Sequence, residues 1–115
     1  MSANIVQGRL LTFHLGELAR EMSAQVLGVI FEGTSRHVAS GKAERWRELM
    51  IARTSAGIVL RDRVRENRDS RDRTISCDWQ LFENVARCIN WLRPDNKLES
   101  RARSRLIDML PPAQA

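Results

Sequence analysis

The chain lacks several features that would narrow its class. It has no tyrosine, only two cysteines, and no apolar run that approaches a membrane span, which takes about 20 residues. Its N-terminus lacks the basic stretch followed by an apolar stretch that marks a secretory signal. We therefore expect a cytoplasmic protein that does not enter the membrane. The two cysteines, Cys77 and Cys88, fit a reducing compartment.

Catalytic and metal-binding motifs are also missing. The candidate metal ligands are His14, His37, Cys77 and Cys88, and none has the close spacing to another that zinc sites usually require. No nucleophile elbow, P-loop or glycine-rich dinucleotide fingerprint occurs. The sequence therefore predicts a non-catalytic protein with no metal and no cofactor.

What the chain does contain is arginine. Of its 19 basic residues 17 are arginine, and the net charge is +5 at pH 7. With 115 residues, 43% apolar and 29% charged, residues 1–115 have the size and composition of one soluble globular domain. Arginine suits phosphate binding and protein interfaces alike, and a GC-rich genome would also enrich it. Composition alone leaves these alternatives open.

Apolar spacing predicts an all-α fold. Residues at three- and four-residue steps predict helices over 8–32, 42–66, 76–93 and 96–110, followed by a disordered tail at 111–115. Ser40 and Ser76 are candidate N-caps, and either Asp95 or Asn96 is expected to start the last helix. No sustained apolar alternation and no Asn-Gly hairpin signal a strand. We expect two long helices that form a hairpin, followed by two shorter helices.

Residues 61–73 are the most polar stretch of the chain. They read RDRVRENRDSRDR, with six arginines, four acidic residues and a single apolar residue, Val64. As the end of a helix and the link beyond it, the segment would pair its own charges, for example Asp62 with Arg65. A solvated charged face is therefore the favoured interpretation, ahead of contact with a protein or with a nucleic acid.

The apolar stripe on residues 8–32 is wider than one neighbouring helix needs, which predicts a helical homodimer. Trp46 is expected in the core, whereas Trp79 and Trp91 are candidates for an exposed contact, because tryptophan and arginine are enriched in interface hot spots. The predicted apolar partner-binding residues are Leu11, Leu15, Leu18, Met22, Trp79 and Trp91. The predicted basic residues, for a protein or a nucleic acid, are Arg61, Arg65, Arg68, Arg71, Arg73, Arg101 and Arg105.

Two functions follow as expectations. In size and class, a short, helical, arginine-rich chain resembles small bacterial or phage regulators that mask another protein, such as antiactivators of transcription factors. The leading hypothesis is therefore an inhibitor that blocks dimerisation or DNA binding of a larger regulatory protein by helix-in-groove contact. The alternative is a basic DNA- or RNA-binding protein that uses its arginine clusters.

Overall fold

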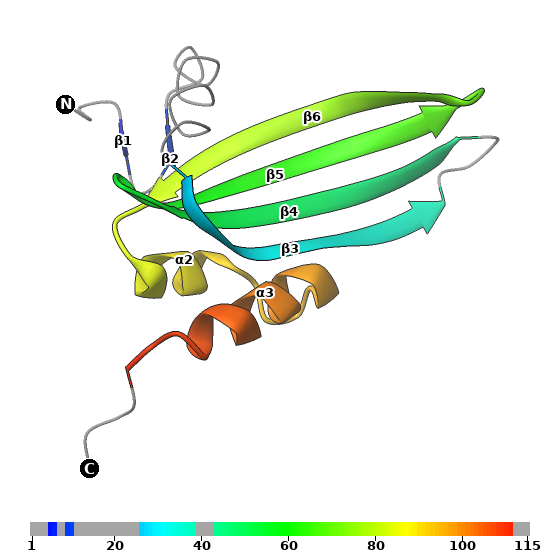
Figure 1. The fold of residues 1–115 in the computed structure, drawn as a ribbon. Helices are drawn as coiled ribbons and strands as arrows, with labels where there is room; N and C mark the ends of the chain where they lie inside the picture. Colours follow the sequence, from blue (N-terminus) through cyan, green and yellow to red (C-terminus); the bar gives the residue numbers. More distant parts are fainter. Residues whose placement is uncertain (1–4, 7–8, 11–25, 39–42, 112–115) are drawn as a thin grey trace.

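The computed structural model describes residues 5–6, 9–10, 26–38 and 43–111, and over them the fold is mostly antiparallel sheet (Figure 1). The elements are β1 (Ile5–Val6), β2 (Arg9–Leu10), β3 (Val26–Val38), β4 (Glu44–Thr54), β5 (Gly57–Arg68), β6 (Arg71–Phe82), α2 (Val85–Trp91) and α3 (Lys97–Ile107). The strands form one sheet in the order β1-β2-β6-β5-β4-β3. The all-α prediction is wrong.

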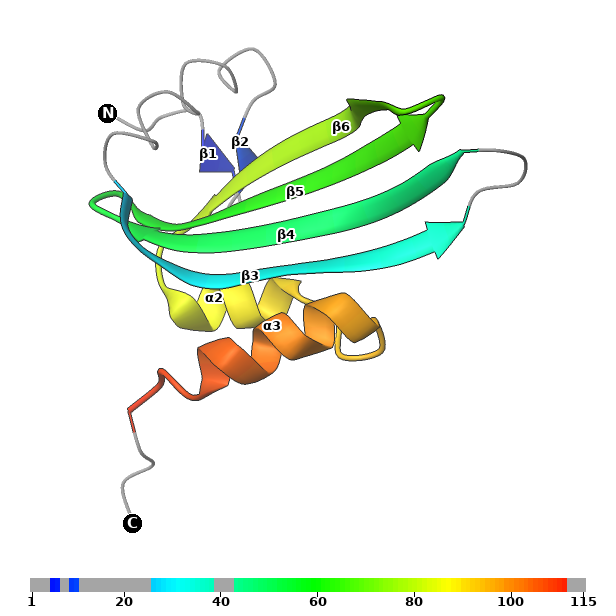
Figure 2. The same ribbon diagram turned by 45° about the vertical axis from the view of Figure 1, so that its right-hand side comes forward.

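The two helices lie together against one face of the long strands (Figure 2). The core fills the space between helices and sheet, and Leu49, Leu60 and Leu106 are each 0% exposed within it. Phe82 of β6 contacts Trp91 of α2, with ring centroids 6.2 Å apart. Side chains alternate between the faces of a strand, so every second residue of β4 and β5, which pair without a shift, lies on the side of the sheet that α2 and α3 cover.

The predicted helix over 42–66 is instead the β4–β5 hairpin. Residues 49–52 and 58–60 are apolar throughout and buried on both sides of the sheet. A strand buried on both faces has no apolar alternation, so its sequence is easily taken for a buried helix. The register runs without a shift from Glu44 opposite Asn67 to Thr54 opposite Gly57.

The second hairpin turns inside the arginine-rich segment. Arg68 pairs with Arg71, and the two residues between them, Asp69 and Ser70, have φ of 54° and 63°. Two consecutive left-handed residues make a turn whose twist matches the flanking strands. Residues 61–73 are therefore the tip of the β5–β6 hairpin and not a helix end.

The remaining predicted helices have mixed outcomes. Residues 76–82 of the predicted third helix lie in β6, and the helix α2 begins only after Asn84, whose side chain accepts a hydrogen bond from the Arg87 backbone N–H. A helix is observed at α3, where Asn96 caps the Glu99 backbone N–H at 3.0 Å. Residues 9–10 and 26–32 of the predicted first helix are in strands. The apolar partner-binding residues predicted on that helix lie outside the described residues: Leu11, Leu15, Leu18 and Met22. Ser40 and residues 112–115 also lie outside them.

Helix length also bears on the membrane prediction. Within the part of the chain that the structure describes, no helix is both long and apolar enough to cross a bilayer.

Candidate functional site

A row of arginines runs along β5 on the face of the sheet turned away from α2 and α3, here called the far face. Arg61, Arg63 and Arg65 occupy alternate positions of the strand, so their side chains share this face. The register sets Arg61 opposite Trp79 of β6 and Arg65 opposite Trp46 of β4. The row therefore lies between two tryptophans.

Strand geometry separates the charges of β5. Asp62 and Glu66 alternate with the arginines and point to the helix side, where they pair with Arg47 and Arg45. The internal pairing expected from helical spacing does not form, because neighbouring residues of a strand face opposite ways. The far face of β5 consequently carries three positive charges and no acid of its own strand.

Arg63, the middle member of the row, has a carboxylate partner. Its guanidinium lies 2.6 Å from a carboxylate oxygen of Glu48 on β4, and the indole N–H of Trp46 donates to the other oxygen at 3.0 Å. Burial disfavours the charged form of Glu48, but these hydrogen bonds outweigh burial and lower its pKa. The cluster fixes Trp46 and Arg63 in place.

Arg61 and Arg65 differ from Arg63. The Nε atoms of both are buried and have no hydrogen-bond partner, and within the described residues neither side chain reaches a carboxylate at ion-pair distance. A buried donor left without an acceptor costs about 1–3 kcal/mol. Because these Nε atoms are buried, an anionic ligand on the far face would pair with the outer nitrogens of the two guanidiniums.

The two tryptophans are half-buried and differently placed. The guanidiniums of Arg36 and Arg65 lie 5.8 and 5.9 Å from the Trp46 ring centroid, within cation–π range. Trp46 is thus half-buried on the far face and does not belong to the core, where it was expected. Trp79 has no such cation over it among the described residues, and its place beside Arg61 makes it the better stacking surface.

A half-open cavity of about 520 Å³ lies beside the row. It is lined by Glu32, Gly33, Thr34, Glu48, Leu49, Arg61, Arg63 and Arg101. Arg61 and Arg63 make the β5 wall of this cavity positive, whereas its two acidic residues, Glu32 and Glu48, come from β3 and β4. Toward the β4–β5 turn the far face is closed, because Ala52, Val59 and Leu81 are buried there.

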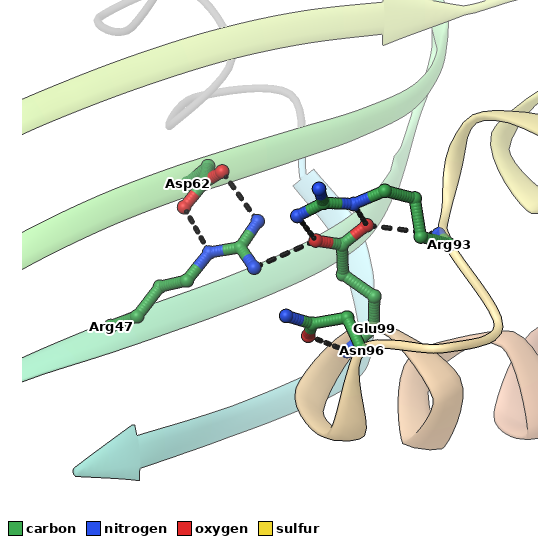
Figure 3. Close-up of polar contacts among 5 residues, drawn as sticks. All are labelled: Arg47, Asp62, Arg93, Asn96 and Glu99. Atoms are coloured by element: carbon green, nitrogen blue, oxygen red, sulfur yellow. Dashed lines mark hydrogen bonds and ion pairs between the residues drawn. The ribbon is translucent and has the colours of Figure 1, made fainter. Parts of the chain in front are cut away.

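Arginines on the helix side serve the fold. Arg47 of β4 binds Asp62 through two hydrogen bonds of 2.9 and 2.8 Å and reaches Glu99 of α3 at 2.7 Å (Figure 3). Glu99 also accepts from the backbone and side chain of Arg93, at 2.9 Å each. Burial would raise the pKa of Glu99, but the contacts with Arg93 and Arg47 dominate and lower it to about 2. Figure 3 shows this chain of charges joining the sheet to the start of α3.

Glu66 forms a second helix-side cluster near the hairpin tip. Its side chain is 0% exposed and lies 2.8 Å from Arg45, 3.0 Å from Arg73 and 3.6 Å from Arg68. The hydrogen bond from Arg45 makes the largest contribution to lowering the pKa of Glu66. Arg68 and Arg73, both predicted partner-binding residues, are therefore turned toward this acid and away from the Arg61 row.

The other predicted site residues are dispersed. Arg71 flanks the hairpin turn, Arg101 lies over the Phe31 ring at 6.0 Å, and Arg105 donates to the Ile30 carbonyl oxygen at 3.3 Å. Trp91 packs against the core. Sequence reasoning named Arg61, Arg65 and Trp79 but missed Arg63 and the role of Trp46. The alternation of arginine with other residues over 61–66 was the available signal.

The described ranges contain no group of three or more His, Cys, Asp or Glu side chains that could hold a metal ion. Cys77 and Cys88 are both free. No family model, curated protein or solved structure matches this chain.

Proposed function

We propose that this protein binds single-stranded nucleic acid across the far face of β5 and β6. The observation that carries the proposal is the pair of arginines without carboxylate partners, Arg61 and Arg65, set between Trp46 and Trp79. Single strands are held by positive grooves that follow the backbone and by aromatic side chains on which bases stack. The far face has both features within one hairpin.

Two further points support a single strand over a duplex. A sheet face can contact bases that are splayed out, as recognition of single-stranded RNA typically requires. Reading duplex DNA in the major groove takes a protruding helix or a two-stranded ribbon. The β5–β6 hairpin is such a ribbon, but Arg68 and Arg73 near its tip are engaged by Glu66. A reducing cytoplasmic location, consistent with two free thiols, is part of the proposal.

Fluorescence anisotropy with labelled oligo-dT, oligo-U and a duplex of equal length tests the proposal. We expect the single strands to bind, to quench tryptophan fluorescence, and to dissociate steeply as salt rises from about 50 to 200 mM. Preference for the duplex would indicate that nucleic acid binds at the tip of the β5–β6 hairpin and not on the far face. Absence of binding to every probe at low salt would exclude nucleic acid as the ligand.

Binding and masking of another protein, such as a transcription regulator, is the second candidate. Three large apolar side chains at the end of α3 are exposed, Ile107 at 47%, Met109 at 38% and Leu110 at 39%, and exposed apolar clusters often mark protein contacts. A stoichiometric partner from the native host, lost when Met109 and Leu110 become serine but kept by Arg61→Gln, would favour this function. A partner retained by the serine variant would argue against it.

A further inference from the structure

The outer strand β3 has two different halves. Residues 26–30 are irregular, since the register with β4 shifts between Val26 and Gly28 and again between Val29 and Phe31. The carbonyl of Ile30, within this half, accepts a hydrogen bond from Arg105. Residues 31–38 pair with β4 without a shift. Bulges protect a sheet edge from pairing with another chain, so only the second half remains an unprotected edge.

The opposite side of the sheet is better protected. There β2 pairs with β6 at Gln80. In the rest of β6 a register shift lies at Ile75, between Thr74, which pairs with Arg65, and Ser76, which pairs with Val64. Residues 31–38, by contrast, contain no proline, no lysine and no bulge, and within the described residues no strand pairs with their outer side. This stretch is the one most able to accept a further strand.

The far-face side chains of residues 31–38 are complementary to the same side chains of a second copy of the chain. Glu32, Thr34 and Arg36 follow one another at alternate positions, and all three are exposed. A two-fold axis perpendicular to the sheet at Thr34 would place Glu32 opposite Arg36 of a second copy, and Arg36 opposite Glu32. Axes at Gly33 or Ser35 would give neither pair. Opposite charges and paired threonines across strands are stabilising contacts.

We propose that two copies of this chain associate edge to edge through residues 31–37 of β3, with the two-fold axis at Thr34. Such an interface is isologous, as expected for a homodimer. The axis keeps the helices of both copies on the same side of one continuous sheet. It also places the two far faces side by side, although the dimer does not depend on what those faces bind.

The position of α3 is compatible with this arrangement. Arg101 lies at Phe31 and Gly33, and Arg105 lies at Ile30, so α3 runs from the axis toward the start of β3 (Figure 1). The α3 of the second copy would run the opposite way. Arg36 contacts Glu44 at 2.7 Å, but that pair is 73% and 44% exposed, and exposed pairs contribute little stability. Glu32 has no cation at ion-pair distance among the described residues.

Sedimentation or light scattering on the full chain tests the dimer. Wild type should have twice the 13.2 kDa chain mass. Glu32→Arg and Arg36→Glu should each weaken the dimer by about tenfold or more, because two attractive cross-strand pairs become two repulsive ones. An equimolar mixture of the two variants should dimerise again, since position 32 of one then faces the opposite charge at position 36 of the other. Charge-matched controls at exposed residues elsewhere are Glu83→Arg and Arg87→Glu.

A cross-link gives a second measurement that does not depend on charge. Thr34→Cys places two thiols directly opposite each other at the axis, within the Cα separation that a disulfide requires. Mild oxidation should convert this variant, but not wild type, to a covalent dimer. A monomeric wild type, or a dimer that survives both charge reversals and fails to cross-link at position 34, would overturn the proposal.

Discussion

Single arginines in this chain have two roles that composition does not separate. On the helix side, Arg45 and Arg47 neutralise acids that folding has buried. On the far face, Arg61 and Arg65 have no such partner in the described chain. Because a strand alternates its side chains, a shift of one position decides which role a residue takes. Under the proposed function, the arginines that bind the ligand are the two on the far face of β5 that have no carboxylate partner among the described residues.

Glu99 gives the sharpest prediction at this scale. It is 1% exposed and joins Arg47 to Arg93, so Glu99→Gln removes the charge that both arginines share. We expect the free energy of unfolding at neutral pH to fall by about 2–3 kcal/mol, somewhat less than for an isolated buried pair because Arg47 keeps Asp62. Urea unfolding measures this. Glu83→Gln, at an exposed position, should change stability by less than about 0.5 kcal/mol.

The same carboxylate makes stability depend on pH. The pKa of Glu99 is lowered from 4.5 to about 2 in the folded chain, so the folded state binds a proton less readily than the unfolded state. Its stabilising contribution is complete above pH 4.5 and is lost as the pH falls toward 2. The stability difference between wild type and Glu99→Gln should shrink over that interval. A difference that stayed constant with pH would contradict the assigned charge network.

At the scale of elements, sequence patterns predicted the last helix correctly and the long strands wrongly. Asn96 was one of two residues expected to start the last helix, and in the structure its side chain caps α3. The long strands were mistaken for helices, because residues 49–52 and 58–60 are buried on both faces and show no alternation. The alternation that did exist was in charge, over residues 61–66, and it was interpreted as helical pairing.

The turn between β5 and β6 yields a prediction about an element. Asp69 and Ser70 both have positive φ, which costs a residue with a side chain about 1 kcal/mol or more. Ser70→Gly removes that cost at the second position, so we expect stability to rise by about 0.5–1 kcal/mol. Thermal or urea unfolding measures the change. Ser104→Gly, in the exposed interior of α3, should instead destabilise by about 0.5 kcal/mol, because serine is an intermediate helix former and glycine a poor one.

At the scale of the whole molecule, the missing information was which strands pair and in what register. Trp46, Arg65 and Thr74 become neighbours only through the β4–β5 and β5–β6 ladders, and nothing in the local sequence states that pairing. The sequence could name Arg61, Arg65 and Trp79 as candidates one by one. The alternation of arginine over residues 61–66 was a signal that could have added Arg63, but only the sheet groups these residues with the tryptophans.

If the arginines without carboxylate partners on the far face bind nucleic acid, their loss should weaken binding more than an equal loss of charge elsewhere. The double variant Arg61→Gln/Arg65→Gln and the control Arg53→Gln/Arg87→Gln lose the same charge, and both control residues are exposed away from the row. By anisotropy with oligo-dT, the first should bind about tenfold or more weakly. Its salt slope should fall by about 1.4, since each phosphate contact to a single strand contributes about 0.7. The control should bind nearly as wild type does. Equal losses in the two variants would show that net charge alone is responsible and that Arg61 and Arg65 form no specific site.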